Sequence, residues 1–387
     1  MDSPVYELRH FDTNLLTFAI HENSADPKVY VTWFDPDHAH LLPLEVQYPP
    51  ASQKPSDESL SRWLRHRAIP NNRAYVHPFL AKCGLNPNRP LDVIKVSKGL
   101  SVNDCYWVTE EGFDGSFAKY NLYDNRFSNI LALIAFTGYG SSIRSGFTSS
   151  PEFTTNGMLP KCWRRVNGTI VLYKAATEGA SNTGFEPYSE YYAAQVAQAL
   201  GVAAIPYGLS RWKGHLCSTC ELFTGKDHSY VPVGRIVRNG GMDAVMEFYR
   251  SLGKKFVDAL ADMFVFDALV FNTDRHYGNF GFLVDNRKNR IVSPAPLFDH
   301  GNSLFNYAGR DDLSSPELFD AYANTLLPCV YDDYVGTAKK YMQPRHHKAL
   351  RKLTQFHFRK HPRHNLTEQR LKLIELQVQK RAKELLR

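Results

Sequence analysis

The sequence contains no run of about 18 or more apolar residues, the length that a transmembrane helix requires. Met1–Asp12 has no basic start followed by an apolar core, so we expect neither a secretory signal peptide nor contact with a membrane. Of the six cysteines, only Cys217 and Cys220 lie close together. A closed zinc site needs a second pair of ligands, so we interpret these two as small side chains on a strand. Free thiols favour a reducing compartment, and we expect a cytoplasmic protein.

Acidic residues are missing from Lys339–His364, a segment that carries nine Lys or Arg and five His residues. The 387-residue chain has a net charge of +7, so its excess of positive charge is concentrated there. A basic segment can contact nucleic acid or an acidic protein. Its aromatic residues are few (Tyr341, Phe356 and Phe358), which favours the alternative of a solvated basic helix face. We expect nucleic acid to be contacted only indirectly, if at all.

The strongest signal for function lies in residues 264–305. An apolar helical pattern ends in a polar loop, a short hairpin follows over 280–292, and the chain then reaches an Asp-His-Gly turn. Protein kinases have a catalytic Asp, an Asn shortly after it, and then a hairpin and a metal-binding Asp-x-Gly. Asp274 and Asn279 have the kinase spacing, and Asp299 lies where the second metal ligand would be.

A second region has features that suit phosphate binding. Ser145–Lys161 is rich in Ser, Thr, Gly and Asn, and the amides of such a loop can approach phosphate oxygens closely. After an Asn-Gly turn at residues 167–168, an apolar strand ends at Lys174. This lysine is either a snorkelling side chain or the kinase lysine that pairs with nucleotide phosphates. A helix expected over Tyr188–Leu200 has Glu190 in its first turn, where the helix dipole favours an acid and where Lys174 could find a partner.

The remaining patterns predict both strands and helices. Alternation of apolar and polar residues predicts strands, and apolar residues at helical spacing predict helices. Asn365, with Glu368 three positions on, has the pattern of a capping box and is expected to begin the last helix. Strands are expected over Leu15–Ile20, Val29–Phe34, part of Val93–Val108 and His215–Phe223, and helices over Ser59–Arg67, Met242–Leu252 and Lys254–Phe271.

These motifs together resemble the HipA-type kinases, a bacterial branch of the protein-kinase-like fold. The matching segments are Thr154–Lys161 (TTNGMLPK), Val171–Lys174 (VLYK), Cys220–Phe223 (CELF), Asn272–Asn279 (NTDRHYGN) and Pro296–Gly301 (PLFDHG). The resemblance implies an α+β, two-lobed kinase-like fold with a β-rich N-lobe, a mainly helical C-lobe and an additional N-terminal α/β region. It implies an accessory region over residues 1–140, an N-lobe with phosphate loop and hinge over 141–225, and a C-lobe over 226–387.

The resemblance also implies roles for individual residues. Asp274 would be the catalytic residue that accepts the proton of the substrate hydroxyl, and Asn279 and Asp299 would hold Mg²⁺ against ATP. Lys174, with Glu190 as its partner, would contact the phosphates. Other contacts to ATP would come from the loop, the hinge backbone and the catalytic loop, namely Thr154, Thr155, Asn156, Gly157, Lys161, Glu221, Phe223, His276 and Asn279. Thr154, with Thr155 beside it, would be the candidate for an autophosphorylation that ejects the loop and inactivates the enzyme.

We therefore predict an ATP- and Mg²⁺-dependent serine/threonine protein kinase, and the resemblance suggests a toxin that an antitoxin protein neutralises. The chain departs from conventional kinases because it lacks a G-x-G-x-x-G loop and because Arg275-His276 follow the catalytic Asp. Phosphorylation of a small molecule or lipid is a variant of this hypothesis. The alternative from another class is a kinase-like regulatory module that binds nucleotide without turnover, either a pseudokinase or the partner of a DNA-bound repressor.

Overall fold

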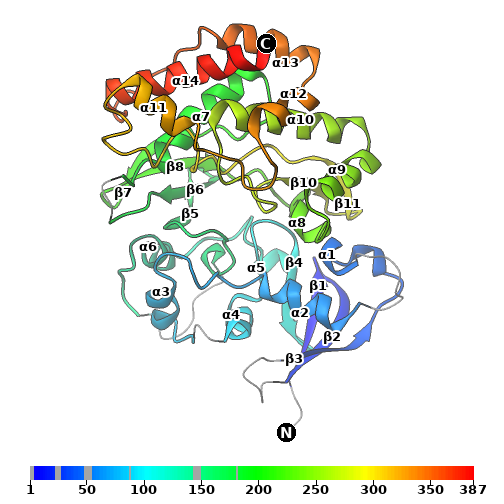
Figure 1. Ribbon diagram of the computed structural model, residues 1–387. Helices are drawn as coiled ribbons and strands as arrows, with labels where there is room; N and C mark the ends of the chain where they lie inside the picture. Colours follow the sequence, from blue (N-terminus) through cyan, green and yellow to red (C-terminus); the bar gives the residue numbers. More distant parts are fainter. Residues whose placement is uncertain (1–3, 22–27, 48–54, 87–88, 143–149, 180–181) are drawn as a thin grey trace. The chain divides into compact units, whose positions relative to one another are not determined.

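Figure 1 shows the computed structural model of the chain, which describes residues 4–21, 28–47, 55–86, 89–142, 150–179 and 182–387. Residues 145–149 of the expected phosphate-binding segment lie outside the described residues. The chain forms two compact units. The first contains Met1–Tyr173, Leu222–Val231 and Leu283–Val292, and the second contains Lys174–Glu221, Pro232–Phe282 and Ser293–Arg387. The boundaries that the resemblance implies, at residues 140 and 225, stay a prediction.

The first unit contains an antiparallel sheet with the strand order β3-β2-β1-β4. Its strands are β1 (Val5–His10), β2 (Thr13–His21), β3 (Lys28–Phe34) and β4 (Tyr106–Glu110). The strands expected over Leu15–Ile20 and Val29–Phe34 are thus confirmed as β2 and β3. Leu8 and Phe18 from the sheet are fully buried and share one core with Trp63 of a neighbouring helix. Apolar burial of this kind is the main stabilising contribution to the unit.

The first unit also contains short helices. They are α1 (Leu44–Gln47), α2 (Asp57–Arg65), α3 (Val76–Lys82), α4 (Pro90–Ser97), α5 (Phe117–Tyr120) and α6 (Asn129–Thr137), with 3-10 turns η1 (Ala39–Leu41) and η2 (Pro151–Phe153). Of these, α2 and α4 pack against strands of this sheet. Helix α2 begins two residues before the expected Ser59, after Ser56, whose side chain accepts a hydrogen bond from the Ser59 N–H at 3.1 Å. The strand expected within Val93–Val108 is wrong in its first part, because α4 continues to Ser97 and β4 begins only at Tyr106. A proline in the first turn of α4 favours the helix.

Two further sheets have the strand orders β5-β6-β8-β7 and β11-β10-β9. Their strands are β5 (Lys161–Val166), β6 (Thr169–Ala175), β7 (Gly208–Trp212), β8 (His215–Glu221), β9 (His228–Pro232), β10 (Gly281–Asp285) and β11 (Arg290–Pro294). Asn167 and Gly168, between β5 and β6, both have positive φ angles, of 51° and 86°, as an Asn-Gly hairpin turn requires. Cys217 is buried in β8, and Cys220 on the same strand is half-buried.

Segments distant in sequence join the first unit through buried amides. Asn286, in the turn after β10, donates from Nδ2 to the carbonyls of Gly225 and Lys226, each at 3.0 Å. Asn289 in the same turn donates to the carbonyl of Leu42 at 2.6 Å. These hydrogen bonds explain why residues 222–231 and 283–292 belong to the same unit as the N-terminal region.

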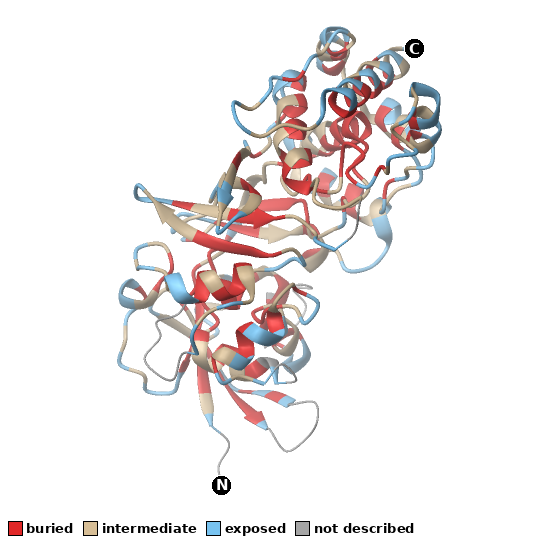
Figure 2. Cartoon of the chain, turned by 90° about the vertical axis from the view of Figure 1, so that its left-hand side faces the viewer, coloured by how far each residue is buried: buried red, intermediate tan, exposed pale blue. Residues whose placement is uncertain are grey.

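The second unit is mainly helical. Its helices are α7 (Glu186–Leu200), α8 (Val233–Ile236), α9 (Gly241–Leu252), α10 (Lys254–Val270), α11 (Pro316–Ala323), α12 (Tyr334–Tyr341), α13 (Pro344–Leu353) and α14 (Glu368–Leu386). The helices expected over Tyr188–Leu200, Met242–Leu252 and Lys254–Phe271 are confirmed as α7, α9 and α10. Every residue from Met263 to Val270 of α10 is buried, so this helix forms the centre of the unit (Figure 2).

The start of the last helix differs from the expectation. Helix α14 begins at Glu368 behind the N-cap Thr367, so the capping box expected at Asn365 is wrong. Asn365 instead accepts hydrogen bonds from the His361 N–H at 2.7 Å and the Tyr192 hydroxyl at 2.9 Å. A local sequence pattern cannot reveal that the distant Tyr192 hydroxyl donates a hydrogen bond to this side chain.

The basic segment Lys339–His364 covers the end of α12, all of α13 and the loop after it. Its Lys and Arg side chains are all exposed, whereas His346 is buried and pairs with Asp262 at 2.7 Å. This is the burial pattern of a solvated helix face. Among the described residues, no helix combines the length and the apolar character that crossing a membrane requires.

A pH dependence of stability is predicted from His10 in the first core. The ring is buried against Tyr106, with centroids 4.7 Å apart, and burial lowers its pKa to about 4 although Asp104 opposes the shift. Below pH 6.5 His10 binds a proton in the unfolded chain but stays neutral in the folded chain. The free energy of unfolding therefore falls as the pH drops from 6.5 toward about 4. His10→Phe keeps the aromatic packing but removes the titrating group. For each pH unit of acidification near pH 5.5, its free energy of unfolding should fall by about 1 kcal/mol less than that of the wild type.

The measurement is urea unfolding of both proteins at several pH values in this range. Carboxylates and other histidines titrate in both proteins, so the difference between the two reports His10. Parallel loss of stability in the two proteins would contradict the prediction.

Candidate functional site

A buried ion pair organises the polar loop after α10. Asp267 and Arg275 are both fully buried, and the guanidinium donates to the carboxylate from Nε and Nη2, each at 3.0 Å. Burial raises the pKa of Asp267, and the positive charge of Arg275 opposes this shift. Burial lowers the pKa of Arg275, but the Asp267 carboxylate outweighs burial and raises this pKa overall. Both groups are held as an ion pair. Arg275 therefore fixes the loop to α10.

Arg275 also brings the two predicted metal ligands together. Its Nη1 donates to the carbonyl of Asn279 at 3.1 Å and to that of Phe298, the residue before Asp299, at 2.7 Å. Its Nη2 contacts Nδ1 of His300 at 3.2 Å. A single guanidinium thus joins the catalytic-loop sequence to the Asp-His-Gly sequence, although Asn279 and Asp299 are 20 positions apart in the chain.

The predicted catalytic residue Asp274 is held by amides. Its N–H donates to Oδ1 of Asn272 at 3.0 Å, and its carbonyl accepts from Nδ2 of Asn279 at 3.0 Å. Its carboxylate accepts at Oδ2 a hydrogen bond of 2.9 Å from Nδ2 of Asn302, whose own Oδ1 accepts from Nδ2 of Asn306 at 3.1 Å. Within the described part of the chain, Oδ1 of Asp274 has no hydrogen-bond partner.

Sequence reasoning missed Asn302 and Asn306. The signal that could have found them is a pair of amides one helical turn apart, directly after the Asp-His-Gly turn. The N–H of Thr273 donates to the Asn302 carbonyl at 3.0 Å, so backbone and side chain of Asn302 together align the loop around Asp274.

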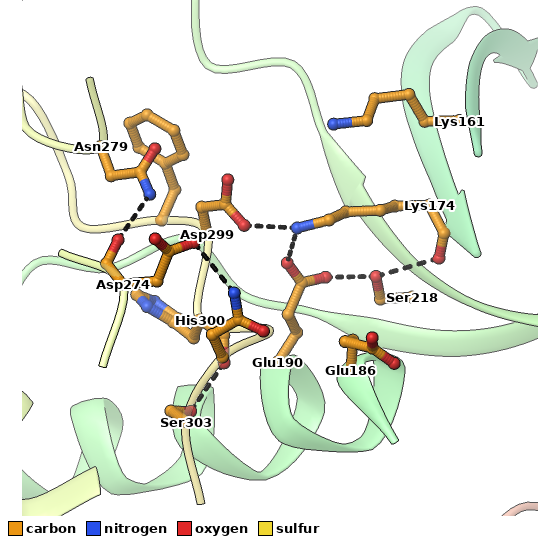
Figure 3. Close-up of polar contacts among 12 residues, drawn as sticks. Lys161, Lys174, Glu186, Glu190, Ser218, Asp274, Asn279, Asp299, His300 and Ser303 are labelled. Carbon is orange, nitrogen blue, oxygen red and sulfur yellow. Dashed lines mark hydrogen bonds and ion pairs between the residues drawn. The ribbon is translucent and has the colours of Figure 1, made fainter. Parts of the chain in front are cut away.

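Lys174 lies between two carboxylates. Its Nζ is 2.7 Å from Oε1 of Glu190 and also pairs with Oδ1 of Asp299 (Figure 3). Burial lowers the pKa of Lys174, but Asp299 and Glu190 outweigh burial and raise it overall, so the side chain is an ammonium. Ser218 donates to the other oxygen of Glu190. Lys174 is therefore not a snorkelling strand-end lysine.

Glu190 differs from the expectation in its position on the helix. Helix α7 begins at Glu186, so Glu186 and not Glu190 lies in the first turn, and the helix-dipole explanation of Glu190 is wrong. Glu190 is 1% exposed and its two oxygens are taken by Lys174 and Ser218. Glu186 is also buried: its Oε1 accepts from the Thr177 hydroxyl at 2.5 Å, and its Oε2 has no partner among the described residues.

The Asp-His-Gly turn has a conformation that its residues explain. Asp299 has a φ of 57°, in the left-handed region, and its N–H donates to the Tyr207 hydroxyl at 3.1 Å. A Cβ at Gly301 would approach Cβ of Glu186 to 3.3 Å and Nζ of Lys174 to 3.6 Å. The absence of a side chain at Gly301 therefore leaves room for Lys174 to reach Asp299.

Asn279 and Asp299 offer the donor atoms that Mg²⁺ prefers. Nδ2 of Asn279 donates to the Asp274 carbonyl, so the amide oxygen of Asn279 is left to bind a cation. Figure 3 shows the Asp299 carboxylate between Asn279 and Lys174. Among the described residues, no group of three or more His, Cys, Asp and Glu side chains could hold a metal. The oxygen ligands fit Mg²⁺ held by few protein groups together with phosphate oxygens, and they do not form an all-protein cage.

The predicted phosphate loop belongs to the first unit and is described there by itself. The Thr154 hydroxyl is buried and donates to the Leu100 carbonyl at 2.8 Å. Thr155 donates to the Pro151 carbonyl at 2.6 Å and accepts from Nε1 of Trp163 at 3.0 Å. Both candidate phosphorylation sites thus have their hydroxyls engaged within the first unit.

Lys161 and Gly157 shape the same loop. Nζ of Lys161 donates to the carbonyl of Asn156 at 2.9 Å. Gly157 has a φ of 92°, a backbone conformation that favours glycine, and a Cβ there would require Nζ of Lys161 to move. Asn156 and Gly157 are exposed, and Lys161 is buried beneath them.

The remaining predicted ATP contacts are spread over both units. Glu221 ends β8 in the second unit, and Phe223 lies in the first unit with its ring 5.6 Å from that of Tyr230. Between them, the Leu222 N–H donates to the Ile170 carbonyl at 2.9 Å. His276 is exposed, and its Nδ1 accepts from the Gly278 N–H at 3.0 Å. The structure brings Lys174, Glu190, Asp274, Asn279 and Asp299 together, and the nucleotide roles of all these residues stay predictions.

Comparisons with known proteins address the fold. No protein-family model matches the chain. The serine/threonine-protein kinase CtkA of Helicobacter pylori is 29% identical over 133 residues, which are 30% of this chain, so the chain spans 40% of the length of that relative. The crystal structure of the H. pylori proinflammatory kinase CtkA is 19% identical, with a TM-score of 0.48 over 60% of this chain and 90% of that one. HipA of Shewanella oneidensis MR-1, in a toxin–antitoxin complex with HipB and operator DNA, is 13% identical, with a TM-score of 0.54 over 98% of this chain and 96% of that one.

The match to HipA covers almost the whole of both chains and confirms the predicted kinase-like α+β fold. Together with the sequence similarity to a kinase, it confirms the resemblance to the HipA-type kinases. The chain thus has a kinase-like fold.

The Asp267–Arg275 pair generates a stability prediction. Asp267→Ala leaves a buried guanidinium without its counter-ion and should lower the free energy of unfolding by about 3–5 kcal/mol. The matched control is Asp258→Ala on the same helix. Its carboxylate contacts Gln343 and Lys254, and the Lys254 side chain is 81% exposed, so we expect a loss below about 1 kcal/mol. Urea unfolding measures both values. Equal losses in the two variants would show that the pair does not organise the site.

Proposed function

We propose that this chain is an ATP- and Mg²⁺-dependent phosphotransferase that acts on Ser or Thr hydroxyls of a protein, as a HipA-like kinase of the cytoplasm. The observation that carries the proposal is the buried bridge from Lys174 to both Glu190 and Asp299. A strand lysine, paired with a helix acid and placed beside an Asp-x-Gly acid, is the arrangement that kinases use around nucleotide phosphates.

The chemistry assigned to each side chain follows from its contacts. Asp274 would accept the proton of the acceptor hydroxyl at Oδ1, because Asn302 occupies Oδ2. Lys174 would bind phosphate oxygens while Glu190 keeps its ammonium in place. Asn279 and Asp299 would hold Mg²⁺ through oxygen atoms, and bound Mg²⁺-ATP would supply the phosphoryl group and neutralise its charge. Positioning and electrostatic stabilisation would supply most of the catalysis.

The test is incubation with Mg²⁺-ATP and a mixture of candidate protein acceptors, followed by intact-mass analysis of the chain and mass spectrometry of the acceptors. We expect the wild type to gain phosphate, with Thr154 or Thr155 as the modified residue, and to label an acceptor. Asp274→Ala and Asp299→Ala should lose at least about 99% of this turnover, since general-base and metal-ligand roles each contribute roughly a hundredfold or more. Asp258→Ala serves as the folded control and should retain activity.

Two results would contradict the proposal. Turnover at the wild-type rate in Asp299→Ala would remove the metal-ligand assignment. Nucleotide binding without phosphate transfer in the wild type, with every acceptor tried, would identify the chain as a regulatory module without turnover.

We also infer an antitoxin protein as partner, because the structurally similar HipA was solved with HipB and operator DNA. A toxin that acts by phosphorylation should arrest growth only when its catalytic residue is intact. Expression of the wild-type chain should therefore stop growth, and expression of Asp274→Ala to the same level should not. Normal growth with an active wild-type enzyme would reject the toxin role and leave the kinase activity unaffected.

A further inference from the structure

One arginine of the accessory region holds the predicted phosphate loop through its backbone. Arg73 lies between α2 and α3 and is 3% exposed. Its Nη1 donates to the carbonyls of Glu152 at 3.2 Å and Thr155 at 3.1 Å, and its Nη2 donates to the carbonyl of Lys161 at 2.6 Å. All these residues belong to the first unit.

The residue after Arg73 adds a fourth contact to the same loop. The N–H of Ala74 donates to the carbonyl of Met158 at 2.7 Å. The four acceptors, at residues 152, 155, 158 and 161, follow one another at intervals of three. The loop therefore winds around the Arg73-Ala74 corner and turns every third carbonyl toward it.

This winding has a consequence for the N–H groups of the loop. Within the described part of the chain, the main-chain N–H groups of residues 155–159 donate no hydrogen bond, and Asn156, Gly157 and Met158 are exposed. Phosphate oxygens are attracted by N–H groups and repelled by carbonyl oxygens. A loop whose carbonyls are drawn to a buried cation presents its amides as a preformed anion site.

The charge on Arg73 is retained despite burial. Burial lowers its pKa to about 10, with the Glu152 carboxylate opposing the shift, so the guanidinium is charged near neutral pH. Glu152 is also buried and is used elsewhere, since its Oε1 accepts from the Trp163 N–H at 3.0 Å. Arg73 thus has carbonyl dipoles as its hydrogen-bond acceptors, and these belong to the loop.

We propose that Arg73 is a positioning residue for the phosphate loop: by binding the carbonyls of Glu152, Thr155 and Lys161 it orients the amides of residues 155–159 toward nucleotide phosphates. The inference rests on the proposed function, and it gives the accessory region a role in nucleotide binding. The Thr154 hydroxyl donates to the Leu100 carbonyl in the same held loop, so release of the loop from Arg73 would also favour exposure of that hydroxyl.

The test compares Arg73→Lys with Arg165→Lys. Lysine keeps the charge but has its donors on a single nitrogen, whereas Arg73 reaches the three carbonyls from two nitrogens. Arg165 is the matched control because it also donates to three main-chain carbonyls, those of Leu122, Tyr123 and Asn125, on a segment outside the loop. Hydrogen exchange without nucleotide should become about tenfold faster at the Ala74 amide in Arg73→Lys and stay unchanged there in Arg165→Lys.

Steady-state kinetics distinguish a positioning role of Arg73 from a purely structural one, which would not change KM for ATP selectively. In Arg73→Lys the KM for ATP should rise about tenfold while kcat changes by less than about twofold, because Asp274 and its supports are untouched. Phosphate on Thr154 should accumulate faster in this variant. Equal behaviour of the two lysine variants, or a fall in kcat without a change in KM, would overturn the assignment.

The wild type provides a measurement that does not depend on a variant folding. Amides of residues 155–159 should exchange rapidly in the free protein and slow by at least about tenfold with saturating Mg²⁺-ADP, whereas the Ala74 amide should be protected in both states. Bound nucleotide that leaves the exchange of 155–159 unchanged would reject the loop orientation. Exchange needs no phosphate transfer, so a protein that binds nucleotide but lacks kinase activity can still confirm or reject the role of Arg73.

Discussion

The site in the second unit depends on the ion pair of Asp267 and Arg275. Its two members have no exposed atoms, and an unpaired charge in such a place would be strongly destabilising. Arg275 also donates to the carbonyls of Asn279 and Phe298. The ion pair that holds Arg275 in place therefore also fixes the catalytic loop against the Asp-His-Gly turn. Stability and site geometry therefore have the same source.

The charges around Lys174 are unbalanced in a way that suits a cation. Glu190 and Asp299 carry two negative charges and share one ammonium, and Asp274 adds a third carboxylate nearby (Figure 3). Glu190 is buried and fully engaged, while the Asp299 side chain is 33% exposed. The excess negative charge is therefore accessible at Asp299, the residue that the resemblance assigns to the metal.

Local patterns predicted much of the fold, because α7, α9 and α10 and the hairpin after Asn279 have strong periodicity and clear ends. They failed where another part of the chain decides the outcome. Residues 93–97 belong to α4, and Asn365 accepts a hydrogen bond from Tyr192 instead of capping a helix. The kinase spacing led to Asp274, Asn279 and Asp299, but Asn302 and Arg73 act through contacts over 28 or more residues that no short motif contains. Side chains that bind distant backbone are thus the part of a site that sequence reasoning misses.

The loop contacts connect nucleotide binding with modification of Thr154. In the conformation described, Arg73 binds carbonyls of the loop, Asn156, Gly157 and Met158 are exposed, and the Thr154 hydroxyl is buried. A hydroxyl in this state is not accessible for phosphate transfer, so modification requires the loop to leave Arg73. Coupling between two states is reciprocal. Under the proposed function, a phosphate bound to the loop amides stabilises the held loop and so opposes modification of Thr154, and a phosphate on Thr154 in turn disfavours binding of phosphate to those amides.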